Sequence, residues 1–338
     1  MKFMVGYQAD EHLKETILRY REAIAEIYFP WIGFTSGRGM VAGYEAQCRM
    51  ESDLDDYTRA GIGMNLLLNG NCYGRRSQSR IFFQSIGDTV ENLCERYHLG
   101  SITTASPLIA KFLKENFPDL EIRASVNMEI GTSVGMDYLA DLFDGFYLKR
   151  EYNKDLARIQ ANRKWCSDHN KKLYLLANSG CLNFCSARTF HDNLVAHQHE
   201  IAEMDNGYEF HGICHSYLAN PEKRKSFLQI TNFIRPEDLA KIEDYFDGIK
   251  LATRTNRNPA AVVKAYAERH YIGNLLDLTE PNHAGHFYPE ILANDRIPND
   301  YADRVLSCDK NCDQCGYCAD ILRSALIRLD EGSVFNKE

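Results

Sequence analysis

The stretch Lys172-Leu-Tyr-Leu-Leu-Ala-Asn178-Ser-Gly180-Cys181 decides how this chain folds and where its chemistry is expected. Its first half is a short apolar and aromatic run, which is typical of a buried strand in a parallel sheet. Polar residues, a glycine and a cysteine follow at once. The end of this strand is therefore where we expect functional groups to begin.

Runs of the same kind recur along the chain, and helical stretches separate most of them. We expect eight strands, at residues 2–7, 31–35, 64–69, 101–105, 121–126, 145–150, 172–178 and 248–253, with a further candidate at 228–233. This alternation predicts an α/β protein whose simplest form is a TIM-like (β/α)8 barrel. An open doubly wound sheet is the alternative, but no Gly-x-Gly-x-x-Gly follows any strand.

Helical spacing of apolar residues and capping signals predict the segments between the strands. The expected helices are 11–27, 88–97, 107–116, 155–170, 236–246, 259–271 and one near 319–329. Residues 1–254 would form the barrel, with a cysteine-bearing insertion at 179–235 before the last strand. Residues 255–338 would form a cysteine-rich C-terminal extension with a four-cysteine metal site.

Composition is that of an ordinary globular protein, with 338 residues, 44% hydrophobic and 25% charged residues. No export leader and no long apolar run is evident, so we expect a cytoplasmic protein without a membrane segment. A net charge of −8 argues against sequence-independent nucleic-acid binding, although a local basic patch leaves a nucleic-acid substrate open. Eleven cysteines in a reducing compartment indicate metal binding rather than disulfides.

The first cysteine group gains its meaning from position. Cys181 and Cys185 follow the seventh expected strand, and Cys72 follows the third, so all would lie at the barrel face where active sites are built. Cys214 lies in the insertion. Three thiolates at 181, 185 and 214, with Cys72 or Cys48 as the fourth, would satisfy a [4Fe–4S] cluster. Buried structural thiols are the alternative.

The second group is Cys308-x3-Cys312-x2-Cys315-x2-Cys318. Its compact spacing is closer to that of ferredoxins than to the paired elbows of zinc sites, so it predicts a second iron–sulfur cluster, with structural zinc as the alternative. Its first three cysteines also match the spacing of radical S-adenosylmethionine enzymes. That signature belongs near the first barrel strand, so we interpret the match as a coincidence.

Charged residues at strand ends are candidates for catalysis. Arg150 and Glu151 end the sixth strand, where an arginine can clamp an anion and a glutamate can move a proton. Lys250 and Arg254 end the last strand with an even separation, which places both on one side. Asn127 ends the fifth strand and could bind substrate. Solvated surface charge is the competing interpretation of the charged pairs.

Three further residues complete the candidate set. His191 follows the Cys185 loop and would donate a proton near the cluster or bind its metal, or else be a plain loop histidine. Arg75 and Arg76 flank Cys72 and are the best local candidates for binding the phosphate of a substrate or cofactor. A solvated loop explains the two arginines almost as well.

Several motifs in order resemble the U32 group, the collagenase-like peptidases, over roughly residues 95–275. They are Ser101-Ile-Thr-Thr-Ala-Ser-Pro-Leu-Ile, Ile122-Arg-Ala-Ser-Val-Asn127, Tyr147-Leu-Lys-Arg-Glu151, Lys172 to Cys181 and Phe246-Asp-Gly-Ile-Lys250-Leu-Ala-Thr-Arg254. The chain departs from the group at Thr253, where a glycine is usual, in its narrower first cysteine spacing and in the added quartet. The resemblance implies a TIM-like barrel that holds a [4Fe–4S] cluster. Related members act in oxygen-independent hydroxylation of ubiquinone precursors and of RNA.

The resulting hypothesis is an iron–sulfur enzyme with one or two [4Fe–4S] clusters. It would carry out an oxygen-independent redox modification, such as hydroxylation, of an anionic small molecule or a nucleic acid, with an electron donor or partner protein. Alternatives are a U32-type peptidase or other hydrolase, a radical S-adenosylmethionine enzyme, and a non-catalytic metal-stabilised partner protein. The peptidase is disfavoured because the sequence contains no His-Glu-x-x-His, and because no cysteine has an obvious catalytic partner that is independent of the metal.

Overall fold

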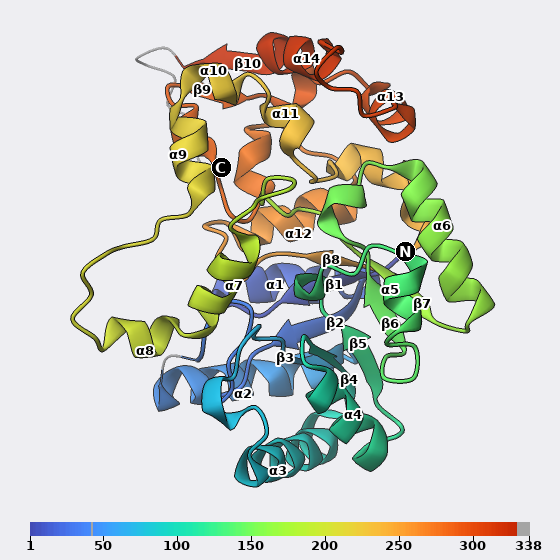
Figure 1. The fold of residues 1–338 in the computed structure, drawn as a ribbon, viewed down its shortest axis with the longest axis vertical. Helices are drawn as coiled ribbons and strands as arrows, with labels where there is room; N and C mark the ends of the chain where they lie inside the picture. The colour runs from blue at the N-terminus through green and yellow to red at the C-terminus, as the bar shows by residue number, and fades with distance from the viewer. Residues whose placement is uncertain (42, 330–338) are drawn as a thin grey trace.

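Eight parallel strands close into a barrel at the centre of the computed structural model (Figure 1). Each strand pairs with its neighbours in chain order, and β1 also pairs with β8, which completes the ring. The strands are β1 (Phe3–Gly6), β2 (Ile24–Phe29), β3 (Gly63–Leu68), β4 (Leu99–Thr104), β5 (Glu121–Ala124), β6 (Gly145–Tyr147), β7 (Lys172–Leu176) and β8 (Gly248–Leu251). The structure describes residues 1–41 and 43–329, so the end of the expected extension, 330–338, lies outside the described residues. The predicted TIM-like barrel is confirmed.

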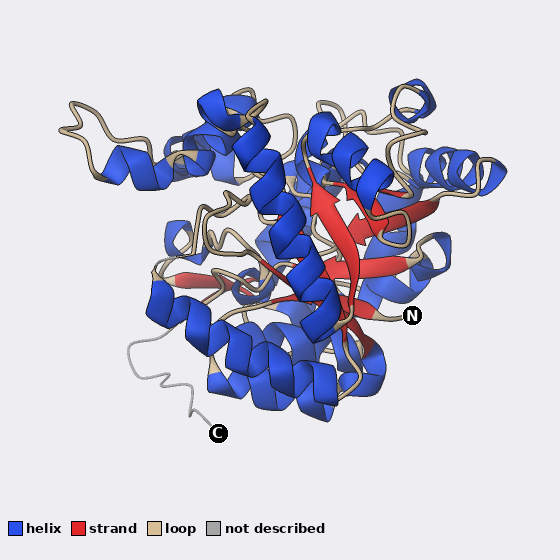
Figure 2. Ribbon diagram, turned by 90° about the horizontal axis from the view of Figure 1, so that it is seen from below, coloured by secondary structure: helices blue, strands red, loops and turns tan. Residues whose placement is uncertain are grey.

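Helices surround the strands on the outside of the barrel (Figure 2). They are α1 (Glu11–Arg19), α2 (Tyr44–Arg59), α3 (Arg80–Tyr97), α4 (Pro107–Asn116), α5 (Ser133–Asp137), α6 (Leu156–Asp168) and α12 (Pro259–Glu268). Local capping sets several of their starts. The Asp10 carboxylate accepts from the Leu13 backbone N–H at 2.7 Å, and Ser106 caps α4, which opens with Pro107.

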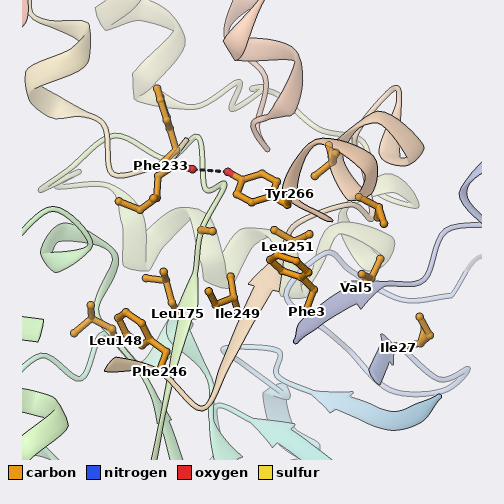
Figure 3. Packing of buried hydrophobic residues seen from close by; sticks show 14 of the residues in the cluster. Phe3, Val5, Ile27, Leu148, Leu175, Phe233, Phe246, Ile249, Leu251 and Tyr266 are labelled. Carbon is orange, nitrogen blue, oxygen red and sulfur yellow. Dashed lines mark hydrogen bonds between the residues drawn. The ribbon is translucent and has the colours of Figure 1, made fainter. Parts of the chain in front are cut away.

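The last of these helices belongs to the barrel's outer layer. Tyr266 of α12 packs against Phe3 at the start of the barrel, and its hydroxyl donates to the Ile234 carbonyl (Figure 3). Ile249 and Leu251 of β8 are buried in the same cluster. Because α12 also packs against α1, it covers the seam between the first and last strands. The division at residue 254 stays a prediction.

The second strand is not where the sequence pattern placed it. The strand expected at 31–35 is wrong, because β2 spans Ile24–Phe29, and the helix expected over 11–27 ends at Arg19. Ile24 and Ile27 fit a helical spacing, but they also fit a buried strand whose two faces are both covered. In the fold, Glu26 and Tyr28 of β2 point into the barrel, whereas Ile27 joins the outer core.

Two further segments differ from expectation. The candidate strand at 228–233 is wrong, since α11 (Phe227–Ile230) occupies it and Thr231 forms a single bridge to Leu182. The helix expected at 236–246 consists of two 3-10 turns, Pro236–Lys241 and Glu243–Tyr245. Both segments are short and buried. Their apolar residues therefore indicate that the segment is buried, but they show neither the helical nor the strand periodicity that would identify the element.

The insertion and the extension pack against each other. The insertion carries α7 (Arg188–Ala196), α8 (Gln198–Ala202), α9 (Ile213–Ala219), α10 (Pro221–Arg224) and α11. The extension carries α13 (Tyr301–Ser307), α14 (Tyr317–Ala325) and a small antiparallel sheet of β9 (Glu290–Leu292) and β10 (Leu326–Arg328). Helix α11 packs on α14 at the top of Figure 1. In the described part of the chain, no helix combines the length and apolarity that crossing a membrane requires.

Candidate active site at the barrel mouth

A paired charge network fills the barrel below its mouth. Arg123 of β5 is buried and donates to Glu26 at 2.6 Å and to Glu121 at 2.8 Å. Burial raises the pKa of Glu121, but its hydrogen bond with Arg123 and further cationic contacts lower that pKa overall to about 2. These charges satisfy one another, so they hold the barrel interior rather than offering a free reactive group.

Lys250 of β8 stands apart from this network. Its side chain is buried, and its Nζ atom lies 3.9 Å from the ring centre of Tyr28 and 5.3 Å from that of Tyr147. Burial, followed by the charge of Arg254, lowers the pKa of Lys250 to about 7. Glu26 would favour the charged form, but its carboxylate is bound by Arg123. Lys250 can therefore take up or release a proton near neutral pH.

Two arginines lie above the lysine. Arg254 follows β8 and donates from Nη2 to the Ser36 hydroxyl at 3.0 Å. Burial lowers the pKa of Arg254 to about 10. Arg38, in the loop after β2, donates to Glu280 at 2.9 Å, and the other oxygen of Glu280 accepts from the Thr255 backbone N–H at 2.9 Å. Glu280 thus orients Arg38 at the rim.

Arg150, on the 3-10 turn Arg150–Tyr152 that follows β6, completes the rim. It donates to the Asn127 side-chain oxygen at 2.7 Å and to Glu129 at 2.9 Å. Its Nε atom is buried, and no partner for it lies among the described residues. A buried donor without a hydrogen-bond partner costs free energy. We therefore expect a ligand or a solvent molecule to accept a hydrogen bond from the Nε–H of Arg150.

One pocket brings these groups together. Its polar lining consists of Tyr28, Arg38, Asn69, Asn127, Arg150, Lys250, Arg254 and Glu280. Four of these side chains are basic and one is acidic. The structure therefore unites four residues that the sequence singled out separately, Asn127, Arg150, Lys250 and Arg254, and the resulting pocket favours an anionic ligand.

Glu151 points elsewhere, although it follows Arg150 directly. Its carboxylate accepts from the Phe184 backbone N–H at 3.2 Å and pairs with Arg188 at 3.2 Å. Arg188 also donates to the Leu182 carbonyl at 2.9 Å. Glu151 thus holds the loop between Cys181 and Cys185 and does not line the mouth pocket.

The first cysteine group lies beside this loop, but among the described residues its three thiols do not all lie within 4.8 Å of one another. Cys181, Cys185 and Cys214 are half-buried and free, and Cys185 and Cys214 line one pocket. Burial raises the pKa of the Cys214 thiol, and the neighbouring Cys181 and Cys185 raise it further. A Cβ atom on Gly212 would lie 3.3 Å from Cys214 Sγ and 3.9 Å from His191 Cε1, so His191 approaches the same group.

The structure places Cys72 in a different cleft, beside His197. A hydrogen bond with His197 lowers the pKa of the Cys72 thiol and raises that of the imidazole. His197 Nδ1 in turn lies 3.0 Å from the Glu200 carboxylate. Cys48 is exposed on α2. The fourth ligand of the first cluster stays a prediction.

The two arginines after Cys72 are exposed on a 3-10 turn, Gly74–Arg76. Arg76 lines the Cys72 cleft with His197, whereas neither Arg75 nor Arg76 lines the mouth pocket. Their predicted role in phosphate binding stays a prediction.

The C-terminal quartet is exposed, apart from the half-buried Cys318 on α14. Burial raises the pKa of Cys318, and the other three thiols add to the effect. Lys154 lies close enough to Cys318 to counter that rise, and burial lowers the pKa of Lys154 itself to about 8. The half-buried Lys154 therefore lies between the barrel and the quartet.

Sequence reasoning missed Arg38, Glu280 and the partnership of Cys72 with His197. Arg38 lies between two glycines, just after the strand that was wrongly expected at 31–35. This pattern predicts a loop, but it does not indicate which groups the arginine would contact. Glu280 comes from the extension, so nothing local connects it with a strand end. His197 is distant from Cys72 in the chain.

No family model matches this chain. Among curated proteins, the uncharacterized protease MJ1657 of Methanocaldococcus jannaschii is 30% identical over 162 residues, which make up 46% of this chain and 46% of that protein. The chain therefore matches about half the length of this curated relative.

Among solved structures, the U32 peptidase Mk0906 superposes with a TM-score of 0.55 and 17% identity, over 74% of this chain and 91% of that one. An alpha-amylase from Lactobacillus plantarum aligns more weakly, with a TM-score of 0.35 and 10% identity, over 55% of this chain and 64% of that one. The resemblance to the U32 group predicted from sequence is confirmed in that a U32 peptidase has this fold.

Proposed function

We propose that this chain is an iron–sulfur enzyme of the U32 type that modifies an anionic substrate at the barrel mouth by an oxygen-independent redox reaction. The observation that carries the proposal is the convergence of four basic side chains and one carboxylate on a single pocket, with Lys250 titrating near neutral pH. Hydroxylation is the form of this reaction that the sequence resemblance to the U32 group implies, with a hydroxylated organic co-substrate giving up its hydroxyl oxygen in exchange for the substrate's hydrogen.

The residues beside the mouth suit a cluster. Cys181, Cys185 and Cys214 offer three free thiols, and His191 offers a nitrogen donor nearby. Arg38 and Arg188 both lie within electrostatic reach of Cys181, where they would offset thiolate charge. A [4Fe–4S] cluster held there would supply electron transfer. Because Arg38 also lines the mouth pocket, it connects the cysteine group with the substrate site.

Different side chains of the mouth pocket would bind the substrate and transfer the proton. Arg38, Arg150 and Arg254 would hold a carboxylate or phosphate through charge-assisted hydrogen bonds. Lys250 would accept a proton from the substrate as a neutral amine, because its pKa of about 7 leaves that form well populated at neutral pH. The rings of Tyr28 and Tyr147 exclude water from the lysine.

Anaerobic purification tests this proposal. Iron and acid-labile sulfide should be present, and the triple variant Cys181→Ser, Cys185→Ser, Cys214→Ser should lose the share held at the first site. Cys94→Ser is the matched control, since Cys94 lies half-buried on α3 away from both groups. Protein that contains zinc alone, or iron that survives the triple variant in full, would refute the cluster at this site.

A second candidate is a peptidase, favoured by the contacts of Cys72 with His197 and of His197 with Glu200. The Cys72 thiolate would attack a peptide carbonyl, His197 would protonate the leaving amine, and water would hydrolyse the thioester. The curated relative is named as an uncharacterized protease and the solved structure as a U32 peptidase, which also favours this candidate. Cleavage of a fluorogenic peptide library that is lost in Cys72→Ala would establish it, whereas cleavage that persists in that variant would exclude this mechanism.

A further inference from the structure

Three histidines from the insertion and the extension meet at one point. His215 lies on α9, and His283 and His286 lie in and beside a 3-10 turn of the extension. Each offers one ligand atom, and these atoms lie within 4.8 Å of one another. Across residues 1–41 and 43–329, no other group of three histidine, cysteine or acidic side chains gathers its ligand atoms this closely.

His283, the buried member of the trio, has a ring nitrogen that is free to bind a metal. His283 is 1% exposed, and its Nε2 atom lies 3.0 Å from the Gly180 carbonyl oxygen. Since a carbonyl can only accept, Nε2 carries the proton and Nδ1 keeps its lone pair. Nδ1 is buried and has no hydrogen-bond partner among the described residues. A backbone carbonyl that fixes the tautomer in this way is the usual support of a metal-binding histidine.

The other two histidines face each other. His286 Nε2 lies 3.0 Å from His215 Nδ1. Two imidazole nitrogens on a tetrahedral zinc ion would be about 3.3 Å apart, given metal–nitrogen distances of about 2.0–2.1 Å. His215 is exposed on the outer side, and Phe227 packs edge-on against His283 on the inner side. The trio thus has a packed wall and an open side.

We propose that His215, His283 and His286 form a mononuclear site for a divalent transition metal of the zinc type, separate from the cysteine groups. Three neutral imidazoles suit zinc and its first-row neighbours, and they leave a fourth position for water or an anion. The site goes beyond the proposed function, which does not use these histidines. It would clamp the insertion to the extension, because its ligands come from both.

Titration with Co²⁺ alone tests the site in a metal-free full chain in which every cysteine of the two groups except Cys214 is changed to serine, because those thiols would otherwise bind cobalt as well. We expect one equivalent to bind with the visible absorption of a tetrahedral ion and without the near-ultraviolet band of a cobalt–thiolate bond. His215→Ala and His286→Ala should each weaken binding by about 100-fold or more, beyond the 10–100-fold effect of a lost supporting residue. His211→Ala is the control, because this histidine of the insertion is 77% exposed.

Cysteine variants separate this site from the proposed cluster. Cys214→Ser should leave Co²⁺ binding unchanged, and His215→Ala should leave the iron and sulfide content unchanged. Loss of cobalt binding when Cys214→Ser is added to that serine-substituted chain, or a thiolate band that persists in it, would overturn the three-histidine site. Equal binding by His215→Ala, His286→Ala and the control would overturn it as well.

Discussion

A Cβ atom added to Gly180 would lie 1.9 Å from the carbonyl oxygen of Pro281, so these two residues meet through their backbones alone. The Gly180 N–H donates to the Glu280 carbonyl at 2.9 Å, and the Glu280 N–H donates to the Asn178 carbonyl at 3.1 Å. The cysteine loop after β7 is therefore docked on the segment that supplies Glu280 to the mouth pocket and His283 to the histidine trio.

Gly180→Ala should lower the free energy of unfolding by about 1–3 kcal/mol, because backbone atoms must move to admit the methyl group. Denaturant unfolding measures this change. Gly207→Ala is the matched control, since a Cβ there meets nothing within 4 Å. Equal stability of the two variants would show that the loop does not depend on this contact.

Lys250→Met should change how stability depends on pH. Burial lowers the pKa of Lys250 to about 7, so between there and the ordinary value of 10.5 the unfolded chain binds a proton that the folded chain lacks. Wild-type stability therefore rises with pH in this window through Lys250. The variant should gain most over wild type below pH 7 and less at pH 9, measured by urea unfolding, with exposed Lys111→Met as control. Parallel pH profiles would contradict a lowered pKa.

Arg254→Ala should weaken anion binding at the mouth by about 10-fold or more, as expected for a lost charge-assisted hydrogen bond. Calorimetric titration with phosphate and with succinate measures the affinity. Arg75→Ala is the control, because this exposed arginine does not line the mouth pocket. A loss confined to Arg75→Ala would instead support the phosphate site predicted from the sequence.

Cys72 should react with iodoacetamide at lower pH than an ordinary thiol, because its hydrogen bond with His197 lowers the thiol pKa. Mass spectrometry of the alkylated peptides gives the rate as a function of pH. His197→Ala should shift the rate profile of Cys72 to higher pH, whereas His211→Ala should not. An unchanged profile in His197→Ala would remove the basis for a nucleophilic Cys72.

The double variant Cys312→Ser, Cys315→Ser should lose one metal site while the first cysteine group keeps its own. Elemental analysis distinguishes the two hypotheses for the quartet. The variant should lose iron and sulfide if the quartet binds an iron–sulfur cluster, and zinc if it is a structural zinc site. Cys166→Ser is the control, since Cys166 is buried in α6. Unchanged metal content in the double variant would show that the quartet holds none.

Strand ends were the part of the site that local sequence could predict. Lys250 and Arg254 were predicted to lie on one side of the last strand, and both line the mouth pocket, although Arg254 lies three residues beyond the end of β8 at Leu251. The same reasoning failed for Glu151, because the chain turns into a 3-10 turn at Arg150 and sends the next side chain to Arg188. A side chain's direction beyond a strand end depends on the turn, which the period does not describe.

From the sequence alone came the barrel, the two cysteine groups and the basic residues at strand ends, because burial and period are local properties of the chain. Tertiary structure alone decided that Arg38 and Glu280 meet at the mouth, that Cys72 meets His197, and that His215 meets His283 and His286. These partners are far apart in the chain and come from loops and from the extension. Their meeting depends on how the insertion and the extension pack, and no spacing of residues in a sequence encodes that packing.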